Sequence, residues 1–161
     1  MTKPTPSTGP VQTTTAARRP MNATGKGQQP GPAAGSLAGC QDYPTAARTA
    51  EEMIHARHRA AGGDAPGPEM TFWDSATAQA LACYLHAAAL GGLAASSVTA
   101  WLAGPAHAAT AAQILATHPG ASRQAAATVR SLLDPTPSKT AQAIRYMAAD
   151  VLAHAAGHRL G

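Results

Sequence analysis

Residues 72–90 read FWDSATAQALACYLHAAAL, and this stretch decides the fold class of the chain. Two aromatic residues and an acid open a long run of small apolar residues that contains no glycine or proline. The larger apolar residues recur at spacings of three and four, which is the period of one face of an α-helix. The residues on this face are Trp73, Thr77, Ala80, Leu81, Tyr84, Leu85 and Ala88. We therefore predict a helix that packs through this face and ends at Gly91-Gly92.

The same helical period recurs on both sides of this stretch, and alternating β-branched runs are absent. Capping residues, prolines and glycines divide the sequence into further helices. These are expected to begin at Asp42-Tyr43-Pro44, Ser96 or Ser97, Gly104-Pro105, Ser122 and Thr136-Pro137. The first is expected to end at Gly62-Gly63, and residues 64–70, DAPGPEM, to form a loop. We therefore predict an all-α, bundle-like domain of five to six helices over residues 37–161.

The core of this domain is expected to be thin. Alanine supplies about a quarter of the chain and aromatic residues only 4%. From Leu37 onward, 26 of 125 residues are Leu, Ile, Val, Met, Phe, Trp or Tyr. Because alanine buries little area, we expect a small stability margin. The other residues expected to face the core are Ala47, Ala50, Met53, Ile54, Ala61, Val98, Trp101, Leu102, Ala111, Ile114, Leu115, Ala125, Val129, Leu132, Leu133, Ile144, Met147, Ala148, Val151, Leu152 and Ala155.

Residues 1–36 differ from the rest in composition and charge. They are rich in Thr, Pro, Gly and Gln and show no apolar period, so we expect a disordered tail. The tail contains Lys3, Arg18, Arg19 and Lys26 without an acid, whereas the eight basic and eight acidic residues of 37–161 sum to zero. At most, weak and non-specific contact of the tail with nucleic acid is expected.

The sequence gives no sign of export or of a membrane span. The start MTKPTPSTG lacks the apolar segment of a signal peptide, and no segment approaches 18 strongly apolar residues. Cys40 and Cys83 have no metal-binding spacing; a disulfide between them is possible, and Cys83 is more simply a buried apolar residue. We therefore expect a cytoplasmic location.

A phosphate-binding loop is not present. The dipeptide Gly25-Lys26 has Pro20 where the first glycine of the motif is required and Gly27 where Ser or Thr is required. We therefore expect no nucleotide cofactor.

Two pairs of histidines are candidates for metal binding. His154 and His158 are four residues apart, and His55 and His58 are three apart. A closed zinc site needs four ligands and neither pair has an obvious third, so we expect both to lie on solvated helix faces. His86 lies off the apolar face, and we expect it on the surface or in a satisfied structural position. No metal is expected.

The acidic residues do not form a catalytic pattern. Glu51 and Glu52 are adjacent, so they diverge around a helix. Asp74 is expected in the first turn of its helix, where its charge favours the helix dipole. The motif GxSxG is absent. We therefore expect no catalytic residues and no enzyme activity.

A helix-turn-helix outline runs from Val98–Leu102 through Gly104-Pro105 to Ala106–Ala116. A recognition helix needs cations or amides to contact phosphates and bases. The residues available for this are His107, Thr110 and Gln113, and no Lys or Arg occurs between Arg59 and Arg123. A small DNA-binding regulator is therefore an alternative with little support.

Three short motifs, in this order, resemble a known family. They are Leu37-Ala38-Gly39-Cys40-Gln41-Asp42, Phe72-Trp73 and Leu85–Leu90, followed by a short helix with a tryptophan at Val98–Leu102. This arrangement is similar to the all-α domain of conjugative coupling proteins, the TraG/TraD-like ATPases of type IV secretion systems, in their actinobacterial form. The resemblance covers roughly Leu37 to Ala156.

In that family, the all-α domain helps to select the relaxase-bound DNA or the secreted protein for transfer. The Walker motifs and membrane helices of the family are not present in these 161 residues. The resemblance therefore implies a module for recognition of cargo, with a relaxase or a coupling ATPase as partner, and does not imply ATPase activity. It makes Phe72, Trp73 and Trp101 candidates for partner binding or for anchoring the core. A non-functional gene remnant is a further alternative.

Overall fold

The computed structural model describes residues 37–62, 68–134 and 138–157. These residues contain six helices and no strand, which confirms the prediction of an all-α fold. The helices are α1 (Tyr43–Ala60), α2 (Pro68–Leu90), α3 (Ala95–Ala103), α4 (Pro105–Thr117), α5 (Arg123–Leu132) and α6 (Lys139–Gly157).

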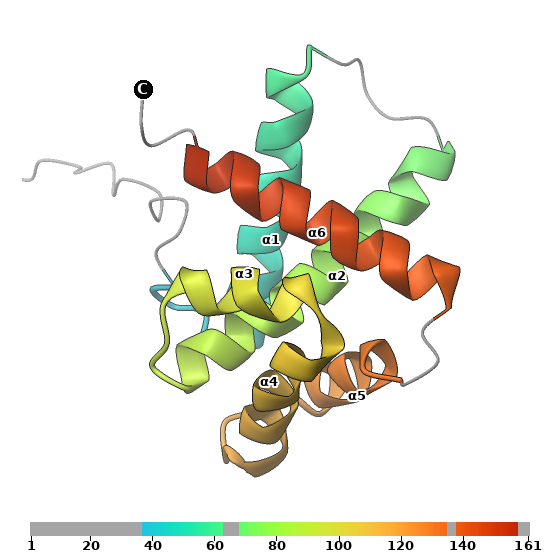
Figure 1. Cartoon of the computed structure of the whole chain (residues 1–161). Coiled ribbons are helices and arrows are strands. Elements are labelled where there is room, and N and C mark those ends of the chain that lie inside the picture. The colour runs from blue at the N-terminus through green and yellow to red at the C-terminus, as the bar shows by residue number, and fades with distance from the viewer. Residues whose placement is uncertain (1–36, 63–67, 135–137, 158–161) are drawn as a thin grey trace, which may run out of the picture.

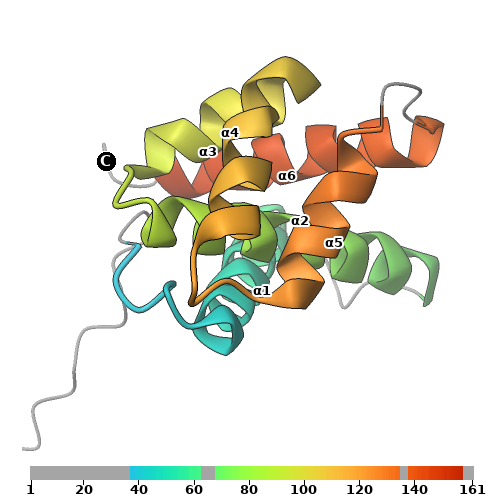
Figure 2. The ribbon, with the colours of Figure 1, turned by 90° about the horizontal axis from the view of Figure 1, so that it is seen from below.

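Helix α2 is the central element of the fold and packs against all five other helices. Helix α6 crosses over α1 and α2 in the view of Figure 1, and α4 and α5 lie together at the lower end of the molecule. Figure 2, seen from below, places these two helices in front of α2. The core therefore surrounds α2 on all sides instead of lying along one face of it.

More of α2 is buried than the single face predicted from the sequence, because other helices pack on all of its sides. From Thr77 to Ala89, every residue except Gln79 is buried. The predicted face is indeed buried from Thr77 onward, but Ala82, Cys83 and Ala87 on the other sides are buried too. A helix that is apolar all round is typical of the centre of a core. Because half of its buried residues are alanine, five neighbouring helices can approach it.

Several helix boundaries follow the predicted local chemistry. Asp42 Oδ2 accepts hydrogen bonds from the backbone N–H and the hydroxyl of Thr45, at 3.1 and 2.7 Å, which caps α1 one residue before Tyr43-Pro44. Gly104-Pro105 begins α4, and Ser122 caps α5. Gly92 follows the end of α2 with a φ of +62°, a conformation in which an L side chain is strained.

Three boundary predictions are wrong or lie outside the described residues. Helix α2 begins at Pro68, so residues 68–70 are helical and not part of a loop; proline is favourable in a first turn. Ala94, not Ser96 or Ser97, precedes α3, and no side chain caps that helix. Ser138 Oγ accepts from the backbone N–H of Ala141 at 3.1 Å at the start of α6, whereas Thr136-Pro137 lies outside the described residues. Gly63 and residues 64–67 also lie outside them.

Most of the residues expected in the core are buried. The half-buried exceptions are Ala47, Ile114, Leu133 and Ile144, which pack against the margin of the core, and Met147. Ala61 is exposed because α1 has already ended at Ala60.

Candidate functional site

An open cavity of about 590 Å³ lies between α1 and α2, and we refer to it as the α1–α2 groove. Its lining consists of Tyr43, Ala47, Glu51, Ile54, His55, His58, Thr71, Asp74, Ser75, Ala78, Gln79 and Gln124. The aliphatic members Ala47, Ile54 and Ala78 are buried or half-buried, while the polar members Glu51 and Gln79 are exposed. The groove therefore has an apolar base and a polar rim.

One pair of side chains crosses this groove. His58 Nε2 lies 3.0 Å from Asp74 Oδ2, and the two side chains are only 19% and 16% exposed. His58 was expected on a solvated face, and that expectation is wrong because Asp74 of α2 covers it. Asp74 is also not in a first turn, since α2 begins six residues earlier at Pro68. The pair thus links α1 to α2.

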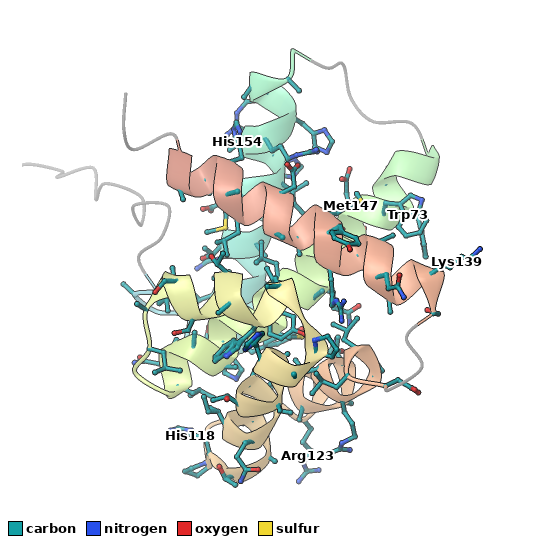
Figure 3. All side chains as sticks on the ribbon, in the orientation of Figure 1. Trp73, His118, Arg123, Lys139, Met147 and His154 are labelled. Atoms are coloured by element: carbon teal, nitrogen blue, oxygen red, sulfur yellow. The ribbon has the colours of Figure 1, made fainter. Side chains whose placement is uncertain are left out.

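The three aromatic residues singled out in the sequence occupy three different environments. Phe72 is 61% exposed and packs edge-on against Trp73, with ring centroids 5.5 Å apart. Trp73 is half-buried and lies toward the start of α2, on the side where α6 passes (Figure 3). Trp101 is buried, with its ring 6.2 Å from that of Tyr84. The structure therefore does not bring these three residues together, and only Phe72 presents a large apolar surface to solvent.

His86 is a structural residue that the sequence could not assign. Its Nε2 accepts the backbone N–H of Ser122 at 3.1 Å, and its Nδ1 lies 2.9 Å from the carbonyl oxygen of Cys40. Because a backbone N–H can only donate, the ring proton lies on Nδ1 and is donated to Cys40. The ring is 1% exposed, so the expectation of a surface position is wrong and the structural alternative holds.

The two cysteines are free and buried. Cys40 Sγ donates a weak hydrogen bond to Thr49 Oγ1 at 3.9 Å, and Cys83 Sγ lies 3.7 Å from the hydroxyl of Tyr43. Burial raises the pKa of both thiols above the ordinary value. Cys83 is thus a buried small residue, as expected, and the possible disulfide is not formed.

A group of four buried polar atoms on α2 and α6 has no hydrogen-bond partner among the described residues. It consists of Thr77 Oγ1 and Tyr84 Oη on α2 and of Nε and Nη1 of Arg145 on α6. Burial raises the pKa of Tyr84 to about 12, although the nearby positive charge of Arg145 acts in the opposite direction. Each buried polar atom without a hydrogen bond lowers the free energy of unfolding. The packing of α2 against α6 therefore stabilises the domain less than the buried area alone would indicate.

A smaller cavity of about 410 Å³ lies between α4 and α5, and we refer to it as the α4–α5 groove. Its polar lining comes from His118, Arg123 and Arg130, which are all exposed. Figure 3 shows His118 and Arg123 together at the lower end of the molecule. The net charge of residues 37–161 is zero, so it gave no indication of this local group of basic side chains. The local signal in the sequence is that no Asp or Glu occurs between Asp74 and Asp134.

The helix-turn-helix outline considered in the sequence corresponds to α3, Gly104 and α4. His107, Thr110 and Gln113 are exposed on α4, as such an outline would require. Gly25-Lys26, His158 and the basic residues of the tail lie outside the described residues.

Within the described part of the chain, no three His, Cys, Asp or Glu side chains are arranged as metal ligands would be. None of the described helices is long and apolar enough to cross a membrane. Comparisons of the chain with protein-family models, with curated proteins and with solved structures find no match.

Proposed function

We propose that this chain is a protein-interaction module, related to the all-α domain of conjugative coupling proteins, that recognises a relaxase or a coupling ATPase. The observation that supports this proposal most directly is the α1–α2 groove, together with the exposed Phe72 on the same turn of α2 as Thr71 and Asp74. The proposed role is recognition without catalysis.

The shape and lining of the groove suit a segment of protein. A groove between two helices accepts the apolar face of an amphipathic helix, and interfaces combine an apolar centre with a polar rim. Ala47, Ile54 and Ala78 supply the centre, and Glu51 and Gln79 belong to the rim. Phe72 adds an exposed aromatic ring, and aromatic rings are common among the residues that dominate binding.

The polar side chains of the groove favour recognition over acid–base chemistry. His58 and Asp74 are engaged with each other at 3.0 Å, and Glu51 and His55 are exposed to solvent. No nucleophile is hydrogen-bonded to the histidine among the described contacts. The proposal therefore assigns no reaction to these residues.

Two alternatives are separated from this proposal by experiment. A DNA-binding regulator built on α3 and α4 has less support, because His107, Thr110 and Gln113 offer no permanent positive charge. A gene remnant that still folds would bind no partner of the conjugation machinery.

The test is calorimetric titration of the full chain with a relaxase and with the cytosolic part of a coupling ATPase from the same genome. Binding of one of them is expected, and Phe72→Ala should weaken it by about tenfold or more. Tyr146→Ala is the matched control, since Tyr146 is 74% exposed on α6, whereas Phe72 on α2 is the neighbour of Thr71, which lines the groove.

Three results would contradict the proposal in different ways. Absence of binding to either protein would favour the remnant. An equal loss of affinity in both variants, or no loss in Phe72→Ala, would place the interface elsewhere on the domain.

A further inference from the structure

The lining of the α1–α2 groove carries negative charge and no permanent positive charge. Two of its residues are acids, Glu51 on α1 and Asp74 on α2, and none is Lys or Arg. Glu51 is exposed at the rim and has no ion pair among the described residues. The contact of Asp74 with His58 uses Oδ2, whereas a carboxylate can accept hydrogen bonds at both of its oxygens. The groove therefore suits a ligand that brings positive charge.

The arginines on the neighbouring surface do not cancel this charge. Arg57 of α1 is paired with Asp150 of α6 at 2.6 Å. Arg48 is four residues from Glu52, a spacing at which opposite charges lie side by side on a helix. Arg123 of α5 lines the α4–α5 groove instead. The two lining acids are thus left to a cation from outside the described helices.

The chain itself contains such a ligand in residues 16–21, AARRPM, which we refer to as the arginine segment. Arg18 and Arg19 are the only adjacent basic residues among residues 1–36, which contain no acid. A guanidinium binds a carboxylate through two parallel hydrogen bonds, which makes arginine the cation best suited to this contact. The arginine segment and the groove are therefore complementary in charge.

The apolar residues of the arginine segment also suit the groove. Ile54 and Ala78 are buried at its base, and Ala47 is half-buried beside them. Met21 is an unbranched apolar side chain of the kind that fills irregular apolar surfaces. The segment thus offers both components of the lining a partner.

The position of the arginine segment in the chain allows it to reach the groove. On α1 the lining residues run from Tyr43 to His58, about 22 Å along the helix axis. The described structure begins at Leu37, six residues before Tyr43. Arg19 is 18 residues from Leu37, and a coil of that length has a root-mean-square end-to-end distance of about 20–25 Å. A tether matched to its span gives an effective concentration on the order of 1 mM, so a contact that is weak between separate molecules can form within one chain.

From these observations we propose that the arginine segment of the chain's own tail occupies the α1–α2 groove, with Arg18 and Arg19 against Glu51 and Asp74, and that a partner protein displaces it. The inference deepens the proposed function, and its second part, displacement by a partner, rests on that function. An occupied groove lowers the apparent affinity for the partner by the fraction of molecules in which the groove is free.

The test attaches a nitroxide spin label to the tail of the full chain and records the amide signals of the ¹⁵N-labelled protein by NMR. Ala16→Cys supplies the reactive thiol, because the native Cys40 and Cys83 are buried. The amide signals of the groove-lining residues of α1 and α2 should broaden, and that of the exposed Gln113 on α4 should not. Added salt should reduce the broadening, because it screens exposed charges.

The arginines are tested by a pair of double variants in the labelled chain. Arg18→Gln/Arg19→Gln should abolish most of the broadening and strengthen binding of the relaxase or coupling ATPase by about two- to fivefold. Lys3→Gln/Lys26→Gln is the matched control, because it removes the same charge from the same tail and should leave both measurements unchanged.

The groove is tested by a second pair of variants. Glu51→Gln should reduce the broadening, whereas Glu52→Gln should not, because Glu52 is exposed on the same helix but does not line the groove. A mixture of spin-labelled chains without ¹⁵N and ¹⁵N-labelled chains without the spin label detects docking between molecules. The mixture should show no broadening of the groove signals.

The proposal is overturned if the two double variants of the tail give the same broadening, or if Glu51→Gln and Glu52→Gln do. Broadening in the mixture equal to that within one chain would assign the groove to the tail of a second copy and would also refute it. Titration with the two partner proteins reports separately on the proposed function. Partner binding without docking of the tail overturns this inference alone, whereas docking of the tail without binding of either protein supports the docking and overturns the proposed function.

Discussion

The backbone N–H of Ser122 donates to Nε2 of His86 at 3.1 Å, so a side chain near the C-terminal end of α2 holds the start of α5. The opposite nitrogen of the same ring binds the carbonyl of Cys40, in the turn that precedes α1. Tyr43 packs edge-on against this ring with a centroid distance of 5.6 Å. One buried imidazole therefore joins three segments that are far apart in the sequence.

His86→Leu should destabilise the domain strongly. It keeps an apolar volume in the core but leaves the buried carbonyl of Cys40 and the partly buried N–H of Ser122 unpaired; a fully buried unpaired group costs about 1–3 kcal/mol and a partly buried one less. Urea unfolding should show a loss of about 2–4 kcal/mol, while the exposed His107→Leu on α4 should stay within about 0.5 kcal/mol of the parent. Equal stability of the two variants would mean that the bridge does not support the fold.

Tyr84→Phe should stabilise the domain. The hydroxyl of Tyr84 is buried and has no described partner, so its removal relieves an unmade hydrogen bond while the ring keeps its contact with Trp101. We expect a gain of about 1 kcal/mol in the free energy of unfolding. Tyr43→Phe is the control, since its hydroxyl lies 3.7 Å from Cys83 Sγ, and should give no gain. A loss of stability in Tyr84→Phe would show that the hydroxyl is bonded after all.

The domain should lose stability in alkaline solution. Burial raises the pKa of Cys40, Cys83, Tyr43 and Tyr84, that of Tyr84 to about 12, so the folded state holds these groups in their neutral form. The unfolded chain releases their protons near the ordinary values of 9.0 and 10.0. These four groups therefore leave the free energy of unfolding unchanged below pH 9 and lower it as the pH rises toward 12. Urea midpoints that stay constant between pH 8 and about 11 would contradict this expectation.

Gly91→Ala should be destabilising through one identified contact. A Cβ at this position would lie 2.8 Å from Ile114 Cδ1, so the side chain of Ile114 must move. We expect a loss of about 1 kcal/mol, measured by urea unfolding.

The double-mutant cycle with Ile114→Val isolates this contact, because valine lacks the Cδ1 atom. Gly91→Ala should cost much less in the Ile114→Val background than in the parent. Gly157→Ala is the control, since a Cβ there meets no atom within 4 Å. An equal cost of Gly91→Ala in both backgrounds would assign the loss to the other close contacts of the new Cβ, with Leu93 Cγ at 3.3 Å and the carbonyl oxygen of Ala87 at 3.4 Å.

The local chemistry of the sequence predicts those parts of the fold that depend on neighbouring residues. The cap at Asp42, the start of α4 at Gly104-Pro105 and the cap at Ser122 each involve residues within three positions of one another. Alanine, in contrast, marks no face, because it is tolerated on any side of a helix. The all-round burial of α2 therefore depends on the placement of five other helices, which no period within α2 encodes.

The residues of the candidate sites were harder to predict, because their partners are distant. The two hydrogen bonds of His86 go to backbone atoms of Cys40 and Ser122, and no residue type indicates a backbone acceptor. The pairing of His58 with Asp74 depends on how α1 packs against α2. Phe72 was a candidate for partner binding or for anchoring the core, and its 61% exposure depends on where the other helices pack, which its neighbours in the sequence do not encode.

The alanine-rich surface of α2 also governs how stability changes with temperature. Unfolding raises the heat capacity through newly exposed apolar area and lowers it through exposed peptide groups. A buried alanine exposes little apolar area while its peptide group counts in full, and six of the eleven buried residues from Ala78 to Ala89 are alanines. The heat-capacity change per residue should therefore lie below the usual value of about 12–15 cal/mol/K. The free energy of unfolding of such a domain has a low maximum and changes little with temperature, because the heat-capacity change sets the curvature. Cooling therefore destabilises the folded state only slightly.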